Sequence, residues 1–364
     1  MDEKDRLLLS CLQNGLPLTP RPFAVWAARL GTDNADLLVR IQHLKKDGVF
    51  GGIKAVLDPC SFHYQSAWVA ARFDSAELAS RTEVLWQHPG VIYGCEREHE
   101  FNVWFFIAVP VHHDLQLHVR YLEKISGAGE FLFLPLQKIF KGPGLLNAIG
   151  TEAFSAMNEY FEQQPRAGRV PNFTAEEIGM IRQLQEPFPL TDEPYQKIAA
   201  DLGITEIQAL ERMKALVGRG CLKRIGSFLK AAQSPPDSRS LVVWRIPEEK
   251  LERSGPEIAA FREVLYADRR PAYPEFPYSL YTMIRAETPE ELELTTRRMQ
   301  DRIGKWRHRV MVTIREFKKE RMRYFPKELD VWREQSRLST ETEFMADQRP
   351  ETREKTLGDF PFAV

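Results

Sequence analysis

The chain contains 364 residues, of which 43% are hydrophobic, and its formal net charge is −1. This length and apolar content predict two or more domains with buried cores, while the near-neutral charge excludes a strong overall attraction to nucleic acid or to an anionic membrane. No apolar run approaches the roughly 20 residues that cross a bilayer, and the first residues are acidic where a secretory signal is basic. The four cysteines lack the spacing of metal ligands, so we expect free thiols in a cytoplasmic protein.

The beginning of the chain predicts a winged helix-turn-helix. Residues 6–15, 20–31 and 34–48 carry apolar side chains at three- and four-residue spacing, and the last two segments end at Gly31 and Gly48. The strand-like segment FGGIKAVL, residues 50–57, follows them. Helix, helix, short turn, helix and strand is the order of that motif.

A second type of domain follows along the chain. Residues 66–73, 91–100, 101–109 and 131–140 have the composition of strands, with helical segments after the first and the third of them. Residues 131–140, FLFLPLQKIF, are expected to form one closing strand. The order βαββαβ predicts a ferredoxin-like sheet with helices on one face.

Both domains then occur again. Gly31 corresponds to Gly203 at an offset of 172 residues, and Tyr93 corresponds to Tyr266 at an offset of 173. Thr174 with Glu177, and Thr205 with Gln208, predict capping boxes at two helix starts of the second copy. Arg40 with Arg212, Gly48 with Gly220 and Ile53 with Ile225 share the offset of 172 without a gap, which indicates a duplication.

The predicted fold class is therefore α+β, with two tandem copies of a winged helix-turn-helix plus a ferredoxin-like βαββαβ domain. The expected divisions are 1–57 for the first helix-turn-helix, 58–150 for the first ferredoxin-like domain, 151–171 for a linker, 172–229 for the second helix-turn-helix, 230–327 for the second ferredoxin-like domain, and 328–364 for a charged, flexible tail.

A proline-rich loop in the second copy is a candidate binding element. Three prolines alternate there with Tyr273, Phe276 and Tyr278, directly after Arg269 and Arg270. Prolines stiffen the backbone and favour extended neighbours, so the loop can present aromatic faces beside two guanidinium groups. This suits a planar ligand edged with carboxylates. The alternative is a hairpin loop with a solvated arginine pair.

Three stretches resemble one enzyme family. The architecture resembles the Lrp/AsnC regulators, and YGCEREHEFNVWF, residues 93–105, is similar to the HNYxREHxYNxWF stretch of one subunit of the sirohaem decarboxylases. YADRRPAYPEFPYSLYTMI, residues 266–284, is similar to the HCYxRPxYPxWPYNLxTMIH stretch of the partner subunit, and residues 312–325 resemble that subunit's STREFKKxRxRYF ending. The resemblance covers roughly residues 5–325, with both subunit types fused in one chain.

The resemblance implies a carboxy-lyase. Members of the family remove carbon dioxide from the acetate side chains of sirohaem and give didecarboxysirohaem in alternative haem biosynthesis, and close relatives act in making the haem of nitrite reductase. Sirohaem, an iron tetrapyrrole, would be the substrate. Its conjugated macrocycle can accept the electron pair, so no separate cofactor and no protein-bound metal are expected.

Tyr93 and Tyr266 stand where the family motifs have histidine, and Arg285 stands at the last histidine of the second motif. His99 could transfer a proton or ligate iron, although a single histidine on a strand is often structural. The candidate catalytic residues are Tyr266, Tyr93 and His99. The candidate substrate-binding residues are Arg97, Arg269, Arg270, Tyr273, Phe276, Tyr278, Tyr281, Arg285, Arg315, Lys318 and Lys319.

Two other functions stay open on the sequence. A Lrp/AsnC-type transcriptional regulator is one, but the recognition positions carry Asp33, Asp36, Glu206 and Glu211, which would repel phosphate. We therefore expect no specific DNA binding and no membrane partner, and an internal pseudo-dimer of the two halves. The other is a non-catalytic tetrapyrrole sensor or carrier. The last basic run, residues 315–323, could line the pocket or simply protect an edge strand by charge.

Overall fold

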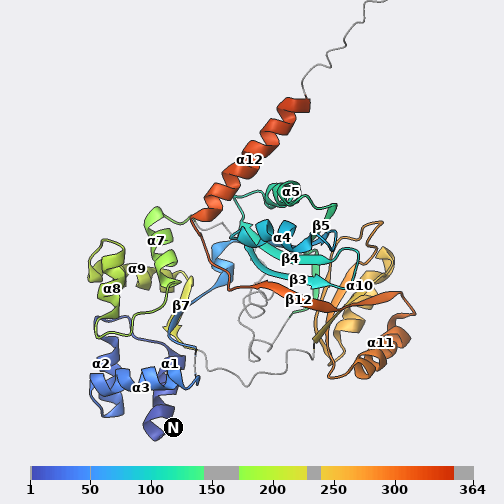
Figure 1. Cartoon of the computed structure of the whole chain (residues 1–364). Helices are drawn as coiled ribbons and strands as arrows, with labels where there is room; N and C mark the ends of the chain where they lie inside the picture. The colour runs from blue at the N-terminus through green and yellow to red at the C-terminus, as the bar shows by residue number, and fades with distance from the viewer. Residues whose placement is uncertain (1, 50, 143–171, 228–238, 348–364) are drawn as a thin grey trace, which may run out of the picture.

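The computed structural model describes residues 2–49, 51–142, 172–227 and 239–347 (Figure 1). The expected linker at 151–171, the expected domain boundaries at 150 and 229, and residues 348–364 of the expected tail lie outside these ranges. Within the described ranges, every helix is too short or too polar to span a bilayer.

Two helix-turn-helix units are present, as predicted. Both capping boxes of the second unit form, since Thr174 and Thr205 each accept the backbone N–H three residues later. The elements of the first unit are α1 (Glu3–Asn14), α2 (Pro22–Leu30), α3 (Asn34–Lys46) and β1 (Lys54–Leu57). Those of the second are α7 (Ala175–Leu184), α8 (Pro194–Asp201), α9 (Glu206–Gly218) and β7 (Leu222–Gly226).

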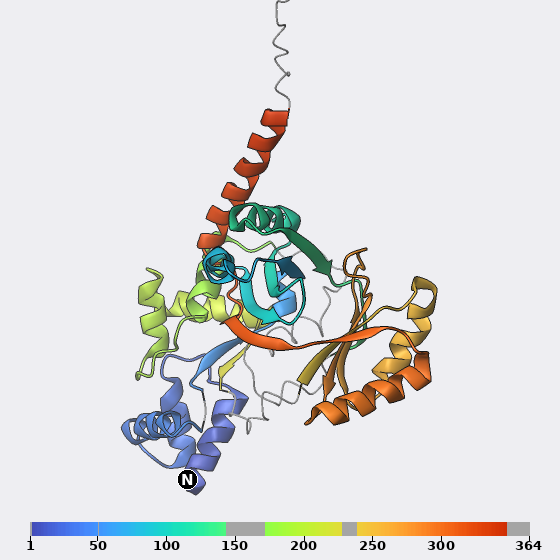
Figure 2. The same ribbon diagram turned by 45° about the vertical axis from the view of Figure 1, so that its right-hand side comes forward.

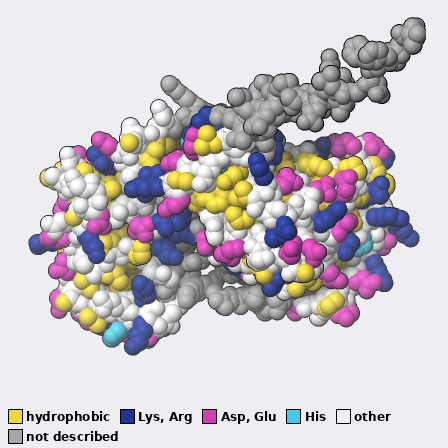
Figure 3. Space-filling model, turned by 45° about the horizontal axis from the view of Figure 1, so that its top comes forward, with side chains coloured by type: hydrophobic (Ala, Val, Ile, Leu, Met, Phe, Trp, Pro, Cys, Tyr) yellow, Lys and Arg dark blue, Asp and Glu magenta, His cyan; other side chains and the backbone are white. Residues whose placement is uncertain are grey.

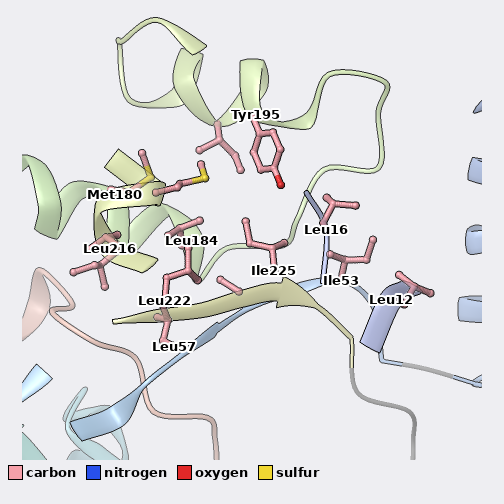
Figure 4. Close-up of a cluster of buried hydrophobic side chains, with 14 of the residues drawn as sticks. Leu12, Leu16, Ile53, Leu57, Met180, Leu184, Tyr195, Leu216, Leu222 and Ile225 are labelled. Carbon is pink, nitrogen blue, oxygen red and sulfur yellow. The ribbon is translucent and has the colours of Figure 1, made fainter. Parts of the chain in front are cut away.

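The two units share one core. Strands β1 and β7 pair antiparallel, with Lys54 opposite Gly226 and Leu57 opposite Leu222. Figure 4 shows side chains of both units meeting around this two-stranded sheet. The labelled residues are Leu12, Leu16, Ile53 and Leu57 from the first unit and Met180, Leu184, Tyr195, Leu216, Leu222 and Ile225 from the second.

The two ferredoxin-like domains also form as predicted. A short 3-10 helix, η1 (Pro59–Phe62), leads into the first domain. That domain contains β2 (Tyr64–Arg72), α4 (Leu78–Gln87), β3 (Val91–Arg97), β4 (Val103–Pro110), α5 (Leu115–Ser126) and β5 (Glu130–Pro135). The second contains β8 (Arg239–Trp244), α10 (Glu248–Ala259), β9 (Val264–Arg269), β10 (Leu280–Arg285), α11 (Pro289–Ile303) and β11 (His308–Met311).

The prediction of one continuous closing strand in each copy is wrong. The chain leaves each sheet after β5 or β11 and adds a further strand, β6 (Lys138–Lys141) or β12 (Thr313–Lys319), to the sheet of the other half. β6 pairs with β9, and β12 pairs with β3. In Figures 1 and 2 the orange β12 runs from the second half onto the cyan strands of the first. We call β6 and β12 the crossing strands.

The crossing strands are held by matching contacts. The Lys318 ammonium of β12 donates to the Trp86 carbonyl at the end of α4, with 2.6 Å between N and O. In the other half, the Lys141 ammonium of β6 donates to the Phe261 carbonyl just after α10, at 2.8 Å. The ring of Phe317 also stacks on Trp86, with centroids 5.1 Å apart. Each lysine therefore fixes its strand to the last helical carbonyls of the half that receives it.

Each sheet is covered by helices on one face and by the other sheet on the opposite face. Alternating residues such as Val69 and Phe105 face α4 and α5, because side chains alternate along a strand. Their neighbours on the opposite face, including Trp104, meet Val243 and Tyr281 of the second sheet in a separate buried cluster. The helix-free faces of the two sheets thus form a common core between the halves.

The structure corrects the expected flexible tail over residues 328–347. These residues form α12 (Glu328–Asp347), which packs beside α5 and projects beyond the body of the molecule (Figure 1). Leu329 and Ser336 are buried, and Trp332 packs against the core beneath α5. Residues three or four apart share one helix face, so a short apolar stripe orders a segment whose composition is mainly charged.

Candidate active site

The candidate catalytic residue Tyr266 belongs to a buried polar group at the end of β9, with Arg270 directly after the strand. Tyr266, Asp268 and Arg270 alternate along the chain and share one face of the sheet. The Tyr266 hydroxyl and the Arg270 guanidinium both donate to the same carboxylate oxygen, Asp268 Oδ2. We call these three residues the Tyr266 cluster.

The Tyr266 cluster is largely out of contact with solvent. Asp268 is 0% exposed and Arg270 is 2% exposed. Burial raises the pKa of the Asp268 carboxyl, although Arg270 opposes the shift. Burial, and then the Asp268 charge, hold the pKa of Tyr266 well above its ordinary value. Tyr266 is therefore a protonated phenol at neutral pH, while the pKa of Asp268 lies above that of an exposed aspartate because burial outweighs the effect of Arg270.

Asp268 has unused capacity for hydrogen bonding. Its second oxygen, Oδ1, is buried without a hydrogen-bond partner among the described residues, and so is the hydroxyl of Tyr281. Tyr281 lies directly opposite Asp268 in the pairing of β10 with β9. Asp268 Oδ1 and the Tyr281 hydroxyl can therefore each take part in a further hydrogen bond.

The corresponding tyrosine of the first half has a different acceptor. The Tyr93 hydroxyl donates to Glu316 Oε1 at 3.0 Å, and Lys319 donates to Glu316 Oε2 at 3.1 Å. Glu316 and Lys319 lie on the crossing strand β12, and both are exposed. Cys95 occupies the place that Asp268 has in the second half. We call Tyr93, Glu316 and Lys319 the Tyr93 cluster.

Arg97 and Arg270 occupy equivalent places and have equivalent contacts. The Arg97 guanidinium donates to the Met311 carbonyl at 2.7 Å and lies 5.6 Å from the ring centre of Trp104. The Arg270 guanidinium donates to the Leu134 carbonyl at 2.7 Å. It lies 5.7 Å from the ring centre of Tyr281, which is equivalent to Trp104. Both carbonyls stand where the chain crosses to the other sheet, so each arginine fixes one crossing.

The proline-rich loop packs against the first half. Phe276 is fully buried, and its ring centre lies 5.6 Å from that of Trp104 and 5.2 Å from that of His99. The Tyr273 hydroxyl donates to the Phe133 carbonyl of β5 at 2.6 Å. Tyr278 packs edge-on to Phe276 at 4.8 Å. The predicted loop is present, and these contacts direct its rings into the core between the sheets.

His99 joins this aromatic group as a half-buried side chain. Its Nδ1 accepts the Phe101 N–H at 3.0 Å. Burial, and then the positive charge of Arg309, lower the pKa of His99 below its ordinary value. The ring is therefore mainly neutral at pH 7.

The remaining predicted cations do not gather in one place. Arg315 pairs with Glu96 at 2.8 Å, and Lys318 binds the end of α4, whereas Lys319 lies beside Tyr93. Arg269 pairs with Glu248 of α10. Arg285 is exposed at the opposite end of β10 from Tyr281. The structure therefore groups Lys319 with Tyr93, and separates Arg269, Arg285 and Arg315 from both tyrosines.

Asp268 and Glu316 are the site residues that the sequence analysis missed. The run Tyr-x-Asp-x-Arg at 266–270 carried the signal for Asp268, since a strand places its alternate residues on one face. Glu316 could not be connected with Tyr93, because that contact depends on the crossing of β12 to the other sheet.

Two arginines of the helix-turn-helix units are paired with carboxylates. Arg40 of α3 pairs with Asp2, Asp5 and Asp36 at 2.8–3.1 Å. Arg212 of α9 pairs with Glu176. On the face drawn in Figure 3, acidic and basic side chains are interspersed. These pairs occupy cations that a DNA-reading helix would direct to phosphates.

Among the described residues, no group of three or more His, Cys, Asp or Glu side chains is placed to hold a metal ion. The side chain of Cys60 is outside the described atoms, while Cys95 and Cys221 are buried thiols and Cys11 is half-buried.

Known protein families match both halves of the chain. Residues 5–50 and 177–222 match the family described as the siroheme decarboxylase NirDL-like HTH domain. Residues 62–141 and 237–318 match the AsnC-like ligand binding domain. Both matches occur twice, in the order that the duplication predicts.

Relatives of known activity extend over nearly the whole chain. A siroheme decarboxylase of Hydrogenobacter thermophilus is 30% identical over 327 residues, which cover 89% of this chain and 96% of that protein. A siroheme decarboxylase beta subunit of Methanosarcina barkeri is 31% identical over 147 residues, 40% of this chain and 97% of the subunit. The crystal structure of the siroheme decarboxylase NirDL in co-complex with an iron-uroporphyrin III analogue matches with a TM-score of 0.68 and 26% identity, covering 93% of this chain and all of that one.

Proposed function

Because this chain belongs to the siroheme (sirohaem) decarboxylase family, we propose that it removes carbon dioxide from the acetate side chains of sirohaem and gives didecarboxysirohaem. The observation that carries this proposal is the match to a single-chain relative of that activity across 89% of the sequence, including both halves. The fold match to NirDL, which holds an iron-uroporphyrin analogue, supports an iron tetrapyrrole as the ligand.

The reaction needs an acceptor for electrons and a donor of a proton. When an acetate group loses carbon dioxide, the bond between its methylene carbon and its carboxylate breaks, and the electron pair stays with the methylene carbon. The conjugated macrocycle can hold that pair, so the substrate itself supplies the difficult chemistry and no additional cofactor is required. A protein group must then protonate the carbon to give a methyl group.

We assign the proton donor to a tyrosine, with Tyr266 first and Tyr93 as the second candidate. Lys319 is an exposed cation beside Tyr93, and we assign it to bind a substrate carboxylate in exchange for its partner Glu316. The buried Arg97 and Arg270 already have carbonyl acceptors, which supports assigning them to the crossing of the strands instead. Phe276 and Tyr281 are buried in the core between the sheets, and we assign them to packing beside the site.

We further propose that the two halves form an internal pseudo-dimer, equivalent to the paired subunits of relatives such as the beta subunit of M. barkeri. Reciprocal strands, β6 on β9 and β12 on β3, support it. So does the common core between the sheets, which includes Trp104, Val243 and Phe276. An isologous arrangement uses the same surface of both partners, as these duplicated contacts do.

Incubation of the purified protein with sirohaem without oxygen tests the function. Mass spectrometry should show a product lighter by two carbon dioxide units, and heat-treated protein should leave sirohaem unchanged. Tetrapyrrole binding without loss of mass would instead identify a sensor or carrier. The proposal would be overturned if the protein neither bound sirohaem nor changed its mass.

A further inference from the structure

The Tyr266 cluster raises a chemical difficulty that its own geometry resolves. A phenol whose pKa is raised well above its ordinary value is a poor proton donor when it acts alone, because a phenolate would form beside the Asp268 carboxylate. A hydroxyl can, however, accept one proton while it gives up another. It then never carries a charge, and the group behind it decides whether the proton can move.

Asp268 is that group, since its Oδ2 is hydrogen-bonded to the Tyr266 hydroxyl. We propose that Asp268 supplies, through the hydroxyl of Tyr266, the proton that replaces the departing carboxylate of the substrate. This inference rests on the proposed function. Tyr266 would be the catalytic residue that touches substrate, and Asp268 a positioning residue that acts through it.

The surroundings of Asp268 favour both states that such a transfer needs. Complete burial favours the protonated carboxyl before the reaction, and it raises the pKa of Asp268. Arg270, which donates to the same oxygen, stabilises the carboxylate that remains afterwards. Among the described residues, the titratable or charged groups that face Asp268 are Tyr266 from β9, Arg270 directly after β9 and Tyr281 from β10, while β6 places the apolar Ile139 opposite it.

The step balances in atoms and charge. The bond between the methylene carbon and the carboxylate breaks, carbon dioxide leaves, and the electron pair passes into the macrocycle. When Oδ2 of Asp268 carries a proton, it donates to the Tyr266 oxygen, and the Tyr266 hydrogen turns from Oδ2 to the substrate carbon. The electron pair then forms a C–H bond with the Tyr266 proton, while the Asp268 proton moves to the Tyr266 oxygen. Asp268 ends as a carboxylate paired with Arg270, and it takes up one proton from solvent before the next turnover.

The first half supplies an internal comparison. Cys95 stands at the position of Asp268, and Tyr93 donates instead to the exposed Glu316. Burial raises the pKa of the Cys95 thiol. The first half has a buried arginine, Arg97, but the carboxylate that contacts its tyrosine is exposed. The inference therefore assigns the proton-transfer chemistry to the second half.

Asp268→Asn tests the inference, because the amide keeps the size and one acceptor but carries no transferable proton. Turnover of sirohaem should fall about 100-fold or more, while sirohaem binding, followed by its absorption spectrum, stays within about threefold of wild type. Wild-type turnover should fall as pH rises through the Asp268 pKa, and the variant should lose that dependence. Cys95→Ser, at the matching position of the first half, should keep wild-type turnover and pH dependence.

Equal turnover and equal pH dependence in Asp268→Asn and wild type would overturn the inference while leaving the proposed function intact. If Asp268→Asn does not fold, difference infrared spectroscopy of the wild-type protein decides. With carbon-13 in its aspartate side chains, the protein should lose a protonated-carboxyl band during a single turnover, and an unchanged spectrum would overturn the inference. Absence of any wild-type decarboxylation would instead refute the proposed function.

Discussion

The tyrosines of the Tyr93 and Tyr266 clusters lie on corresponding strands of a duplicated sequence, yet they differ in how their hydroxyl groups are held. In the second half the acceptor, Asp268, lies on the same strand and is completely buried. In the first half the acceptor, Glu316, is exposed and arrives on a strand from the other half. The arginine that fixes the crossing strand is the same in both. Duplication has thus kept the contacts that join the halves and changed the residue that sets the chemistry of the tyrosine.

Separating the halves should have the largest effect. Fragments 1–167 and 168–364 would each lose the strand that completes their sheet, and the aromatic faces between the sheets would be exposed to water. We expect each fragment alone to be aggregated or unfolded, and the two to copurify as a soluble complex when they are produced together. Size-exclusion chromatography checks this. Two stable monomers that never bind would refute the internal pseudo-dimer.

Removing the equivalent arginines should distinguish the two clusters by stability. Arg270→Met removes the cation that offsets the burial of Asp268, so the pKa of Asp268 in the folded protein rises further, and at pH 7 the free energy of unfolding should fall by about 3–5 kcal/mol. Arg97→Met removes hydrogen bonds to Met311 and Thr313 but leaves no buried acidic group without a partner. The free energy of unfolding should fall by about 1–3 kcal/mol. Urea denaturation followed by circular dichroism measures both. Equal losses would show that the Asp268 charge has no part in the difference.

Removing the hydroxyl groups should distinguish the clusters by activity. Tyr266→Phe should lower decarboxylation about 100-fold, because the ring stays in place and only the proton-bearing group is lost. Tyr93→Phe should lower it less than tenfold, since its hydrogen bond to Glu316 is partly open to water. Single-turnover rates with sirohaem measure the effect, and binding should stay close to wild type in both variants. Wild-type rates in Tyr266→Phe would exclude a chemical role for its hydroxyl.

Acid should destabilise the protein through two buried histidines of the first half. His88 and His118 are buried beneath α12 with ring nitrogens 3.0 Å apart. Burial lowers the pKa of His118 to about 4, and that of His88 also lies far below its ordinary value. An unfolded histidine has a pKa near 6.5. Between about pH 6.5 and 4 the unfolded chain therefore binds protons that the folded chain does not, so stability falls as pH falls.

The expected loss between pH 7 and 5 is about 2 kcal/mol for each of the two histidines. Thermal unfolding of wild type at pH 7, 6 and 5 measures it. His118→Gln should flatten the dependence, whereas His43→Gln, at an exposed position of α3, should not. A dependence that is the same in wild type and His118→Gln would show that this histidine does not determine it.

The sequence could predict what depends on local pattern. Helical spacing, glycine stops and the capping residues Thr174 and Thr205 predicted the helix-turn-helix units, and the two-residue alternation predicted the sheets. It could not predict which sheet receives a closing strand. The two-residue alternation of a strand shows which side chains share a face, but it does not identify the neighbouring strand. Pro135, which has no N–H to donate and ends β5, marked the point of departure.

The predicted site was limited by the same cause. Tyr273, Phe276 and Tyr278 were predicted as ligand-facing rings from their alternation with prolines, but the loop meets the first half, and this contact is invisible in either copy alone. The Tyr266 cluster was only half found. Its tyrosine was identified from the resemblance to the family. Asp268 could have been identified from the alternation Tyr-x-Asp-x-Arg, which places the three side chains on one face of the strand.

The crossing of β12 has a consequence for any version of this protein that is made from two genes. Tyr93 would be encoded in the first gene and its acceptor Glu316 in the second. A subunit released from the ribosome without its partner would carry an incomplete cluster, and only correct pairing would complete it. Assembly would then act as a checkpoint, since a solitary subunit could not present a finished Tyr93 cluster to a reactive tetrapyrrole.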